Sequence, residues 1–334
     1  MARFILEKKK VFEQYKKLKK DFLVSYSYKT NPLVGDILSE KEPFYTVYGF
    51  NYIEKIKNKK KVFFLSPIYT KEKIEEIIKN KIEMLIVDNK ESLDLLLDNI
   101  DFFKDPLILL RWRLREHTIF TGKYYVFGFK TGEIIDLVNL LHKKGIRVGI
   151  HFHRKTQNIG EWDYKEEFLD SFPKEMFEKI EVVNSGGGLP IKYKNSSDKF
   201  LPEILEKLRD FRDFLDNFGI KHFIEPGRFI AGPPIKLEAT VDGISGNTVF
   251  VDCSIYNTAP DIAIYHLRFL VENELEKGRR YLIKGCTPDS IDIFRYSVFL
   301  KDVKKGDKIV FLNAGAYNYR TTLFNLPEVP TEFV

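Results

Sequence analysis

The chain has 334 residues, of which 44% are hydrophobic and 31% are charged. This balance excludes a disordered or fibrous protein and leaves enough apolar material for a large core. The formal net charge is only +6, and lysine-rich segments such as Lys55–Lys61 alternate with acidic ones such as Glu72–Glu76. We therefore expect a solvated surface and no nucleic-acid partner.

Two further patterns bear on where the protein works. Its only cysteines are Cys253 and Cys286, which excludes a disulfide framework and a cysteine-rich metal site. No apolar run approaches the roughly 18 residues of a membrane helix, and Met1–Lys20 lacks the apolar stretch of a secretory signal. We expect a cytoplasmic protein with no membrane contact and no metal.

Eight short apolar runs alternate with amphipathic helical patterns over the first two thirds of the chain. The predicted strands are Phe22–Tyr26, Phe44–Tyr48, Val62–Leu65, Met84–Val87, Leu107–Arg111, Val148–Phe152, Glu181–Asn184 and His222–Glu225. Helical patterns lie between them at Lys71–Asn80, Ser92–Asn99, Thr131–Lys144, Lys165–Phe172 and Phe200–Phe218. Eight buried strands separated by helices predict a (β/α)8 TIM barrel.

The last hundred residues follow a different pattern, with strands joined by turns and little helix. The predicted strands are Ile235–Val241, Thr248–Val251, Tyr281–Lys284, Ser297–Leu300 and Lys308–Leu312. The sequence therefore predicts two domains, a barrel over residues 1–231 and a C-terminal all-β domain over residues 232–334, divided near Gly232–Pro234.

Polar residues and glycines follow four of the predicted barrel strands. Lys29 follows the first strand, His153 the sixth, Gly186–Gly188 the seventh, and Glu225–Arg228 the eighth. Because the carboxyl ends of barrel strands meet at one mouth, we expect these groups to converge there.

The combination of residue types has a specific chemical meaning. Three glycines let backbone N–H groups approach a phosphate, and Arg228 adds a charge-assisted contact. Lys29 beside such an anion site suits a Schiff base with an aldehyde. Glu225 suits a protonated ring nitrogen, and His153 suits stacking on the ring. Phosphate, aldehyde and ring nitrogen together describe pyridoxal 5′-phosphate.

The same segments resemble those of the fold-type III pyridoxal-phosphate amino-acid decarboxylases, which include the ornithine, diaminopimelate and carboxynorspermidine decarboxylases. Six blocks carry the resemblance in order along the chain: Tyr26–Pro32, Ile150–Gln157, Ser185–Pro190, Glu225–Arg228, Gly285–Asp292, and Gly315–Tyr317 with Phe324–Asn325. Each block is common alone, whereas the ordered set is specific to the family.

The resemblance implies a role for each matching residue. Lys29 would bind the cofactor covalently, His153 would stack on its ring, and Glu225 would pair with the ring nitrogen. The residues implied around the phosphate are Thr156, Gly186, Gly187, Gly188, Gly227, Arg228 and Tyr317. The resemblance also implies a head-to-tail homodimer with shared sites, in which Asp289 would face the distal end of the substrate.

Three segments depart from the family pattern. The position of the family's proton-donating cysteine is Pro288 here, and Cys286, two residues earlier, is our candidate for that catalytic role. Lys155–Thr156 replaces a Gly-Ser pair, and Asp252–Tyr256 replaces an Asn-Asp-Gly-x-Tyr segment. The chain also begins close to the first barrel helix, without most of the N-terminal β segment of longer relatives.

We therefore expect a pyridoxal-phosphate decarboxylase for an amino acid with a polar distal group, of the diaminopimelate, ornithine or lysine, or carboxynorspermidine type. One alternative is an amino-acid racemase on the same fold, which Glu225 argues against because such racemases usually place an arginine on the ring nitrogen. The other is a non-catalytic cofactor carrier or a degenerate partner subunit, which Pro288 favours and the β domain opposes.

Purely structural roles are the competing interpretation of several of these residues. Glu225 and Arg228 could form an ion pair that caps a strand. Asp289 and Asp292 could be turn residues. We expect His151 to face away from His153 and to be structural.

Overall fold

The computed structural model describes residues 1–114, 127–154, 159–318, 321 and 323–334. The chain divides into two compact units, of which the first comprises Met1–Tyr15, Pro190–Lys199 and Arg228–Val334, and the second Lys16–Leu189 and Phe200–Gly227. We call them the β unit and the barrel unit.

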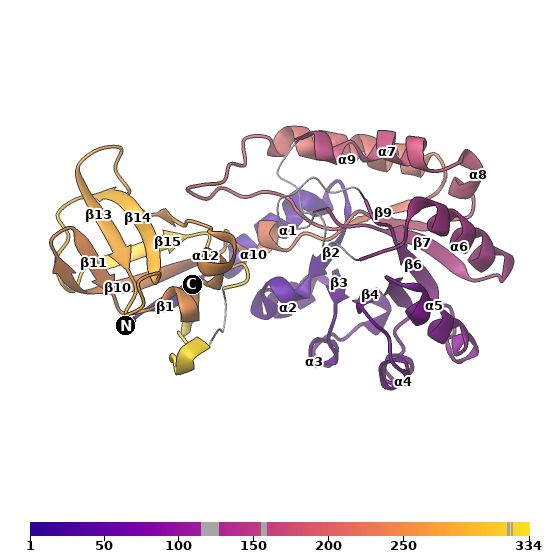
Figure 1. Cartoon of the computed structure of the whole chain (residues 1–334), viewed down its shortest axis with the longest axis horizontal. Coiled ribbons are helices and arrows are strands. Elements are labelled where there is room, and N and C mark those ends of the chain that lie inside the picture. The colour runs from indigo at the N-terminus through magenta and orange to yellow at the C-terminus, as the bar shows by residue number, and fades with distance from the viewer. Residues whose placement is uncertain (115–126, 155–158, 319–320, 322) are drawn as a thin grey trace. The chain divides into compact units, whose positions relative to one another are not determined.

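The barrel unit contains a closed barrel of parallel strands (Figure 1), as predicted. Its strands are β2 (Leu23–Ser27), β3 (Phe44–Val47), β4 (Val62–Leu65), β5 (Met84–Val87), β6 (Leu107–Arg111), β7 (Arg147–His151), β8 (Val182–Asn184) and β9 (Lys221–Ile224). The barrel closes where β9 pairs with β2, with Leu23 opposite Phe223. Each predicted strand lies within one residue of an observed one at both ends, because buried apolar runs in parallel sheets have sharp limits.

Helices lie outside the barrel strands (Figure 1). They are α2 (Pro32–Leu38), α3 (Phe50–Ile53), α4 (Lys71–Lys79), α5 (Lys90–Leu97), α6 (Thr131–Lys143), α7 (Tyr164–Ser171), α8 (Lys174–Phe177) and α9 (Leu201–Asp216), while α1 (Lys8–Lys19) runs across the division between the units. In α9 the buried residues are Ile204, Leu208, Phe211 and Leu215. Their three- and four-residue spacing forms one apolar stripe, which is why this segment is a helix against a sheet.

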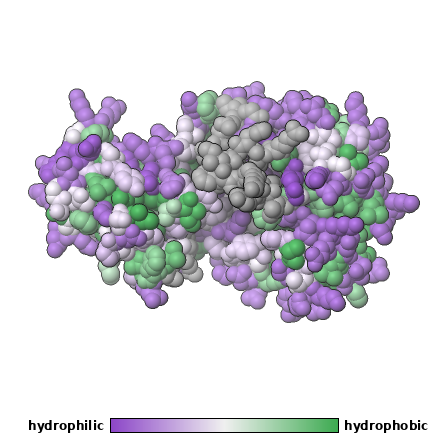
Figure 2. All heavy atoms as spheres, in the orientation of Figure 1, coloured by the Kyte–Doolittle hydropathy of each residue, from purple (hydrophilic) through white to green (hydrophobic). Residues whose placement is uncertain are grey.

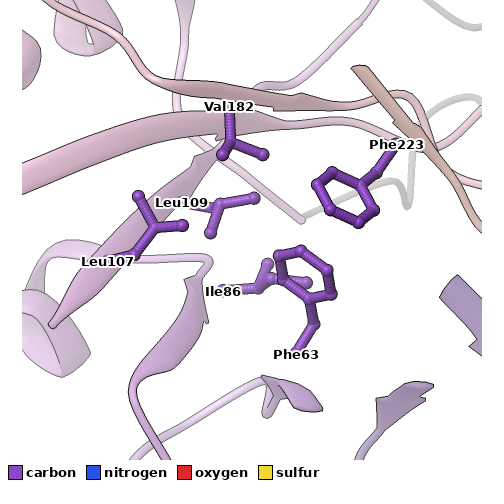
Figure 3. Close-up of a cluster of buried hydrophobic side chains, with 6 residues drawn as sticks. All are labelled: Phe63, Ile86, Leu107, Leu109, Val182 and Phe223. Carbon is purple, nitrogen blue, oxygen red and sulfur yellow. The ribbon is translucent and has the colours of Figure 1, made fainter. Parts of the chain in front are cut away.

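Large apolar side chains fill the barrel interior. Figure 3 shows Phe63, Ile86, Leu107, Leu109, Val182 and Phe223 pointing toward one another from the barrel strands. The rings of Phe63 and Phe223 lie edge to face with centroids 5.0 Å apart, an arrangement that aromatic pairs prefer. Each of these residues precedes the carboxyl end of its strand, so the cluster lies inside the barrel and the residues that follow the strands lie beyond it.

The β unit is built on a sheet with the order β12-β15-β10-β11-β13-β14. Its strands are β10 (Ile235–Ser245), β11 (Thr248–Val251), β12 (Leu270–Val271), β13 (Arg279–Lys284), β14 (Ile293–Leu300) and β15 (Lys308–Leu312). Three short helices accompany them, α10 (Arg228–Ala231), α11 (Ile255–Thr258) and α12 (Pro260–Tyr265). The predicted all-β character is confirmed.

The predicted division of the chain needs correction. Strand β1 (Arg3–Leu6) pairs antiparallel with β10, placing Arg3 opposite Glu238, and parallel with β16 (Thr331–Phe333). The first fifteen residues and Pro190–Lys199 therefore group with the C-terminal residues. The predicted boundary at residue 231 assigned these two segments to the barrel, because strand pairing between distant segments leaves no local pattern in the sequence.

Hydrophilic residues cover most of the molecular face shown in Figure 2. This agrees with charged residues lying on the outer faces of the helices. Within the described ranges, no helix combines the length and the hydropathy needed to cross a membrane.

Candidate active site

The ends of four barrel strands carry the residues singled out in the sequence. Lys29 lies in a 3-10 turn, η1 (Tyr28–Thr30), directly after β2. His153 lies two residues after β7, Gly186 two residues after β8, and Glu225 directly after β9. All four are at the carboxyl ends of parallel strands, where we expected them.

Lys29 is the exposed member of this group. The neighbouring Tyr28 and Thr30 are buried, whereas the Lys29 side chain is open to solvent. In the described parts of the chain, its ammonium forms no hydrogen bond or ion pair. Asn31 caps α2 through hydrogen bonds to the N–H groups of Leu33 and Val34, which holds the end of η1 in place. Lys29 thus presents an exposed side chain, unpaired among the described residues, on a turn whose two neighbouring residues are buried.

Glu225 is a buried carboxylate with a well-defined set of partners. Its Oε1 accepts hydrogen bonds from Thr46 Oγ1 and from Asn184 Nδ2, both at 2.7 Å. Its Oε2 lies 3.6 Å from His151 Nε2. Burial by itself raises the pKa of Glu225, but the electrostatic interaction with His151 and the hydrogen bond from Thr46 outweigh it and lower the pKa to about 2. Glu225 is therefore an anion at neutral pH.

His153 is neutral and has a defined tautomer. Its Nδ1 accepts a hydrogen bond of 3.0 Å from the N–H of Gly187, so the proton of the neutral ring resides on Nε2. Burial and the nearby charge of Arg111 lower the pKa of His153 to about 3. A neutral, oriented imidazole at this position suits stacking on an aromatic ring.

The glycine turn after β8 is held by the barrel's own groups. The N–H of Gly186 donates to Asn184 Oδ1 at 3.0 Å, and the N–H of Gly187 donates to His153. A Cβ on Gly187 would lie 2.5 Å from the carbonyl oxygen of Glu225, so no larger residue fits. We expected all three amides to face a phosphate. Of these three amides, those of Gly186 and Gly187 are already paired, and only that of Gly188 has no hydrogen-bond partner among the described residues.

Gly227 lies against the turn that carries Lys29. A Cβ on Gly227 would collide with the hydroxyl of Thr30. The Thr30 hydroxyl is buried and has no hydrogen-bond partner among the described residues. A buried hydroxyl without a partner costs free energy unless a ligand or water satisfies it.

In the β unit, Arg228 belongs to a cluster of aromatic and acidic groups. Its guanidinium forms a 2.7 Å ion pair with the buried Asp261 and donates to the Tyr193 hydroxyl at 3.1 Å. The same guanidinium lies over the ring of Tyr317, 5.0 Å from its centroid. The predicted alternative of a Glu225–Arg228 ion pair is wrong, since the two residues have different partners.

Asp289 and Asp292 have different surroundings in the β unit. Asp289 accepts a 2.6 Å hydrogen bond from the Tyr256 hydroxyl, which lowers its pKa. Asp292 is fully buried and accepts hydrogen bonds from the N–H groups of Ile255 and Thr287. Asp292 is therefore a structural turn residue, whereas Asp289 remains partly accessible.

The sequence reasoning missed or misjudged several polar partners. The prediction that His151 faces away from His153 is wrong, because side chains two residues apart in an extended strand share a face. Thr46 and Asn184 were missed because single hydroxyls and amides inside strands carry no motif. Asp261 was missed as the partner of Arg228 for the same reason. Thr156, the remaining predicted phosphate ligand, lies outside the described residues.

Comparison with known families and proteins places this geometry in context. The family described as "Pyridoxal-dependent decarboxylase, pyridoxal binding domain" matches residues 36–232. A diaminopimelate decarboxylase of Methanothermobacter thermautotrophicus is 27% identical over 223 residues, covering 61% of this chain and 52% of the relative. A carboxynorspermidine/carboxyspermidine decarboxylase of Campylobacter jejuni is 31% identical over 205 residues, covering 54% and 51% respectively. The chain thus spans about half the length of these relatives.

Solved structures agree in fold. A lysine decarboxylase from Selenomonas ruminantium superposes with a TM-score of 0.86, over 100% of this chain and 92% of that one, at 19% identity. A lysine/ornithine decarboxylase from Vibrio vulnificus, solved with putrescine, superposes with a TM-score of 0.82 at 18% identity. At these identities the similarity establishes a shared fold.

The low pKa of Glu225 predicts how stability depends on pH in the cofactor-free protein. A carboxyl whose pKa falls from its ordinary 4.5 to about 2 on folding stabilises the fold above the ordinary value. That contribution is lost as the pH falls through the folded value. Between pH 5 and pH 2, wild-type protein should therefore lose about 3 kcal/mol more unfolding free energy than Glu225→Gln, measured by urea titration. The exposed Glu75→Gln should follow the wild-type curve, and equal losses in all three proteins would contradict the assignment.

Proposed function

The chain belongs to the pyridoxal-dependent decarboxylase family, and from this premise we propose that it removes the α-carboxylate, as CO2, from an amino acid with a polar distal group. The observation that carries the proposal is the buried anionic Glu225 near a neutral His153, at the same barrel mouth as the free amine of Lys29. An anion beside the ring nitrogen favours decarboxylation and opposes the racemase alternative.

The barrel residues fit pyridoxal phosphate. Glu225 has one oxygen, Oε2, that accepts no hydrogen bond within 3.5 Å from the described chain. Among the described residues, the buried Thr30 hydroxyl, the Gly188 amide and the Lys29 side chain have no hydrogen-bond partner either. These are complementary to a cationic ring nitrogen, to phosphate oxygens and to an aldehyde.

When bound, pyridoxal phosphate supplies a ring that accepts the electron pair left behind as CO2 departs. Lys29 would bind the aldehyde carbon through its amine and return to it after each turnover. Glu225 would keep a proton on the ring nitrogen, because its own low pKa prevents it from taking that proton. His153 would cover one ring face with an uncharged surface.

The phosphate ligands complete the proposal. Gly188 and Thr30 offer an amide and a hydroxyl in the barrel unit, and Gly186, Gly187 and Gly227 allow the close backbone approach that shapes this turn. Arg228, Tyr317 and Thr156 are assigned to the phosphate on the family resemblance.

CO2 release tests the function directly. Protein loaded with pyridoxal phosphate is incubated with ornithine, lysine, diaminopimelate or carboxynorspermidine. Release of CO2 is expected from at least one, and borohydride reduction should attach the cofactor to the peptide containing Lys29. Lys29→Ala should lose both signals, whereas Lys57→Ala, which changes another exposed lysine, should keep both. Racemisation without CO2 would support the racemase, and cofactor binding without either reaction would support a carrier or degenerate subunit.

The proton that replaces CO2 needs a donor, and the proposal assigns it to Cys286. Desolvation and the nearby Asp292 carboxylate raise the pKa of the Cys286 thiol, so it carries a proton at neutral pH. The side chain is exposed at a turn, whereas Cys253 is buried.

Removing the Cys286 thiol should change the products of the reaction. Cys286→Ala is expected to slow turnover about tenfold or more and to accumulate pyridoxamine phosphate, because protonation then occurs on the cofactor carbon. Product analysis by chromatography measures this. Cys253→Ala serves as the matched control, and unchanged turnover without pyridoxamine phosphate in Cys286→Ala would assign the proton to Lys29 or water.

The active unit in this proposal is a head-to-tail homodimer with shared sites. The turn Cys286–Asp292 would reach the partner's barrel, and its Ile291 side chain is 57% exposed, which suits a buried position in a complex. Asp289 would then face the distal end of the substrate bound by the other protomer.

Complementation between inactive variants tests the shared site. Lys29→Ala and Asp289→Ala proteins are mixed under conditions in which fluorescent labels show that subunits exchange. Activity should return to about a quarter of wild type, because one site of each hybrid dimer carries neither change. No recovery despite exchange would place both residues in the site of one protomer.

A further inference from the structure

A row of hydrogen bonds leads from Ser25 through Thr46 to Glu225, and the family resemblance gave neither hydroxyl a role. Ser25 on β2 and Thr46 on β3 are buried, with hydroxyl oxygens 2.8 Å apart. Thr46 in turn lies 2.7 Å from Glu225 Oε1. Asn184 on β8 donates to the same oxygen. One carboxylate oxygen therefore has two internal donors, while the other has none within 3.5 Å among the residues that the structure describes.

The direction of these hydrogen bonds follows from the chemistry of their groups. Glu225 is ionised and can only accept, so the single proton of the Thr46 hydroxyl points to Oε1. The contact between Ser25 and Thr46 must then use the Ser25 proton. Each hydroxyl thus donates toward the carboxylate, and such aligned hydroxyls strengthen one another in a buried environment.

We propose that Thr46, supported by Ser25, is a positioning residue that fixes both the charge and the orientation of Glu225. With Oε1 held by Thr46 and Asn184, the carboxylate presents Oε2 to a cationic ring nitrogen. This inference rests on the proposed function, in which that nitrogen belongs to pyridoxal phosphate. In this proposal Thr46 acts on the cofactor only through its hydrogen bond to Glu225.

Several charged or titratable groups surround the carboxylate and set the background for a test. His151 faces Oε2 from β7, and His153 acts on Glu225 from the segment after β7. Arg111 at the end of β6 and Lys29 after β2 act on His153. None of these residues changes in the variants below, so their contributions cancel when variant and wild type are compared at the same pH.

Two substitutions at Thr46 separate a positioning role from a packing role. Thr46→Val keeps the shape and removes the hydroxyl, whereas Thr46→Ser keeps the hydroxyl and removes a methyl group. A packing role predicts that Ser lowers the thermal midpoint and impairs binding more than Val does. A positioning role predicts the opposite order for cofactor binding, because only Val removes the hydroxyl that donates to Oε1.

The primary readout is the dissociation constant of pyridoxal phosphate, measured by fluorescence at pH 5 and at pH 8. Without the Thr46 donor the pKa of Glu225 rises, so Glu225 loses its charge at a higher pH than in wild type. Thr46→Val should bind the cofactor about tenfold more weakly than wild type at both pH values, because Oε2 is no longer held toward the ring nitrogen, and the loss should be at least as large at pH 5 as at pH 8. Thr46→Ser should stay within about twofold at both. Ser25→Ala should show a smaller loss in the same direction.

A second readout needs no cofactor. The stability of cofactor-free Thr46→Val should begin to fall at a higher pH than that of wild type during acid titration, while Thr46→Ser should follow wild type. If the wild-type protein binds pyridoxal phosphate and Thr46→Val binds it with the same affinity at both pH values, the positioning role is overturned. Absence of pyridoxal phosphate binding by wild-type protein would instead overturn the proposed function, while the acid titration still tests the contact between Thr46 and Glu225.

Discussion

The negative charge of Glu225 inside the barrel is the constraint on which the site depends. A carboxylate taken out of water loses several kcal/mol of hydration free energy unless donors replace that water. Here Thr46 on β3, Asn184 on β8 and His151 on β7 approach it from three strands. Because these partners come from different parts of the barrel, the buried charge has its full set of partners only when the barrel is closed. Fold and site are thus formed in the same step.

The glycine turn after β8 extends this constraint. The side-chain amide of Asn184 makes two hydrogen bonds: its Nδ2 donates to Glu225, and its Oδ1 accepts from the Gly186 N–H. The next amide, that of Gly187, orients His153. Glu225, the turn and the imidazole therefore form one connected unit, and a displacement of any of them disturbs the others. The glycines serve the internal geometry of the protein as much as the approach of a ligand.

The sequence predicted the barrel strands closely because a buried parallel strand is a short apolar run with polar ends, a pattern visible in Met84–Val87 or Leu107–Arg111. The positions of Lys29, His153 and Glu225 followed from the same pattern, since functional groups sit just past strand ends. Contacts that depend on tertiary structure were not predictable. The pairing of β1 with β10, the Asp261 partner of Arg228 and the Thr46 donor each join residues whose spacing in the sequence carries no periodic signal.

The N-terminal strand has a consequence for how the chain matures. Arg3 of β1 hydrogen-bonds to Glu238 of β10, 235 positions later, and the barrel unit lies between them in the sequence. During synthesis from the N-terminus, β1 emerges before the barrel strands and well before β10, so most barrel contacts become available before β1 finds its partner. Until β10 follows, β1 exposes unpaired backbone N–H and C=O groups. The barrel unit is in effect an insertion within the β unit, so assembly of the β sheet is the late, non-local step of folding.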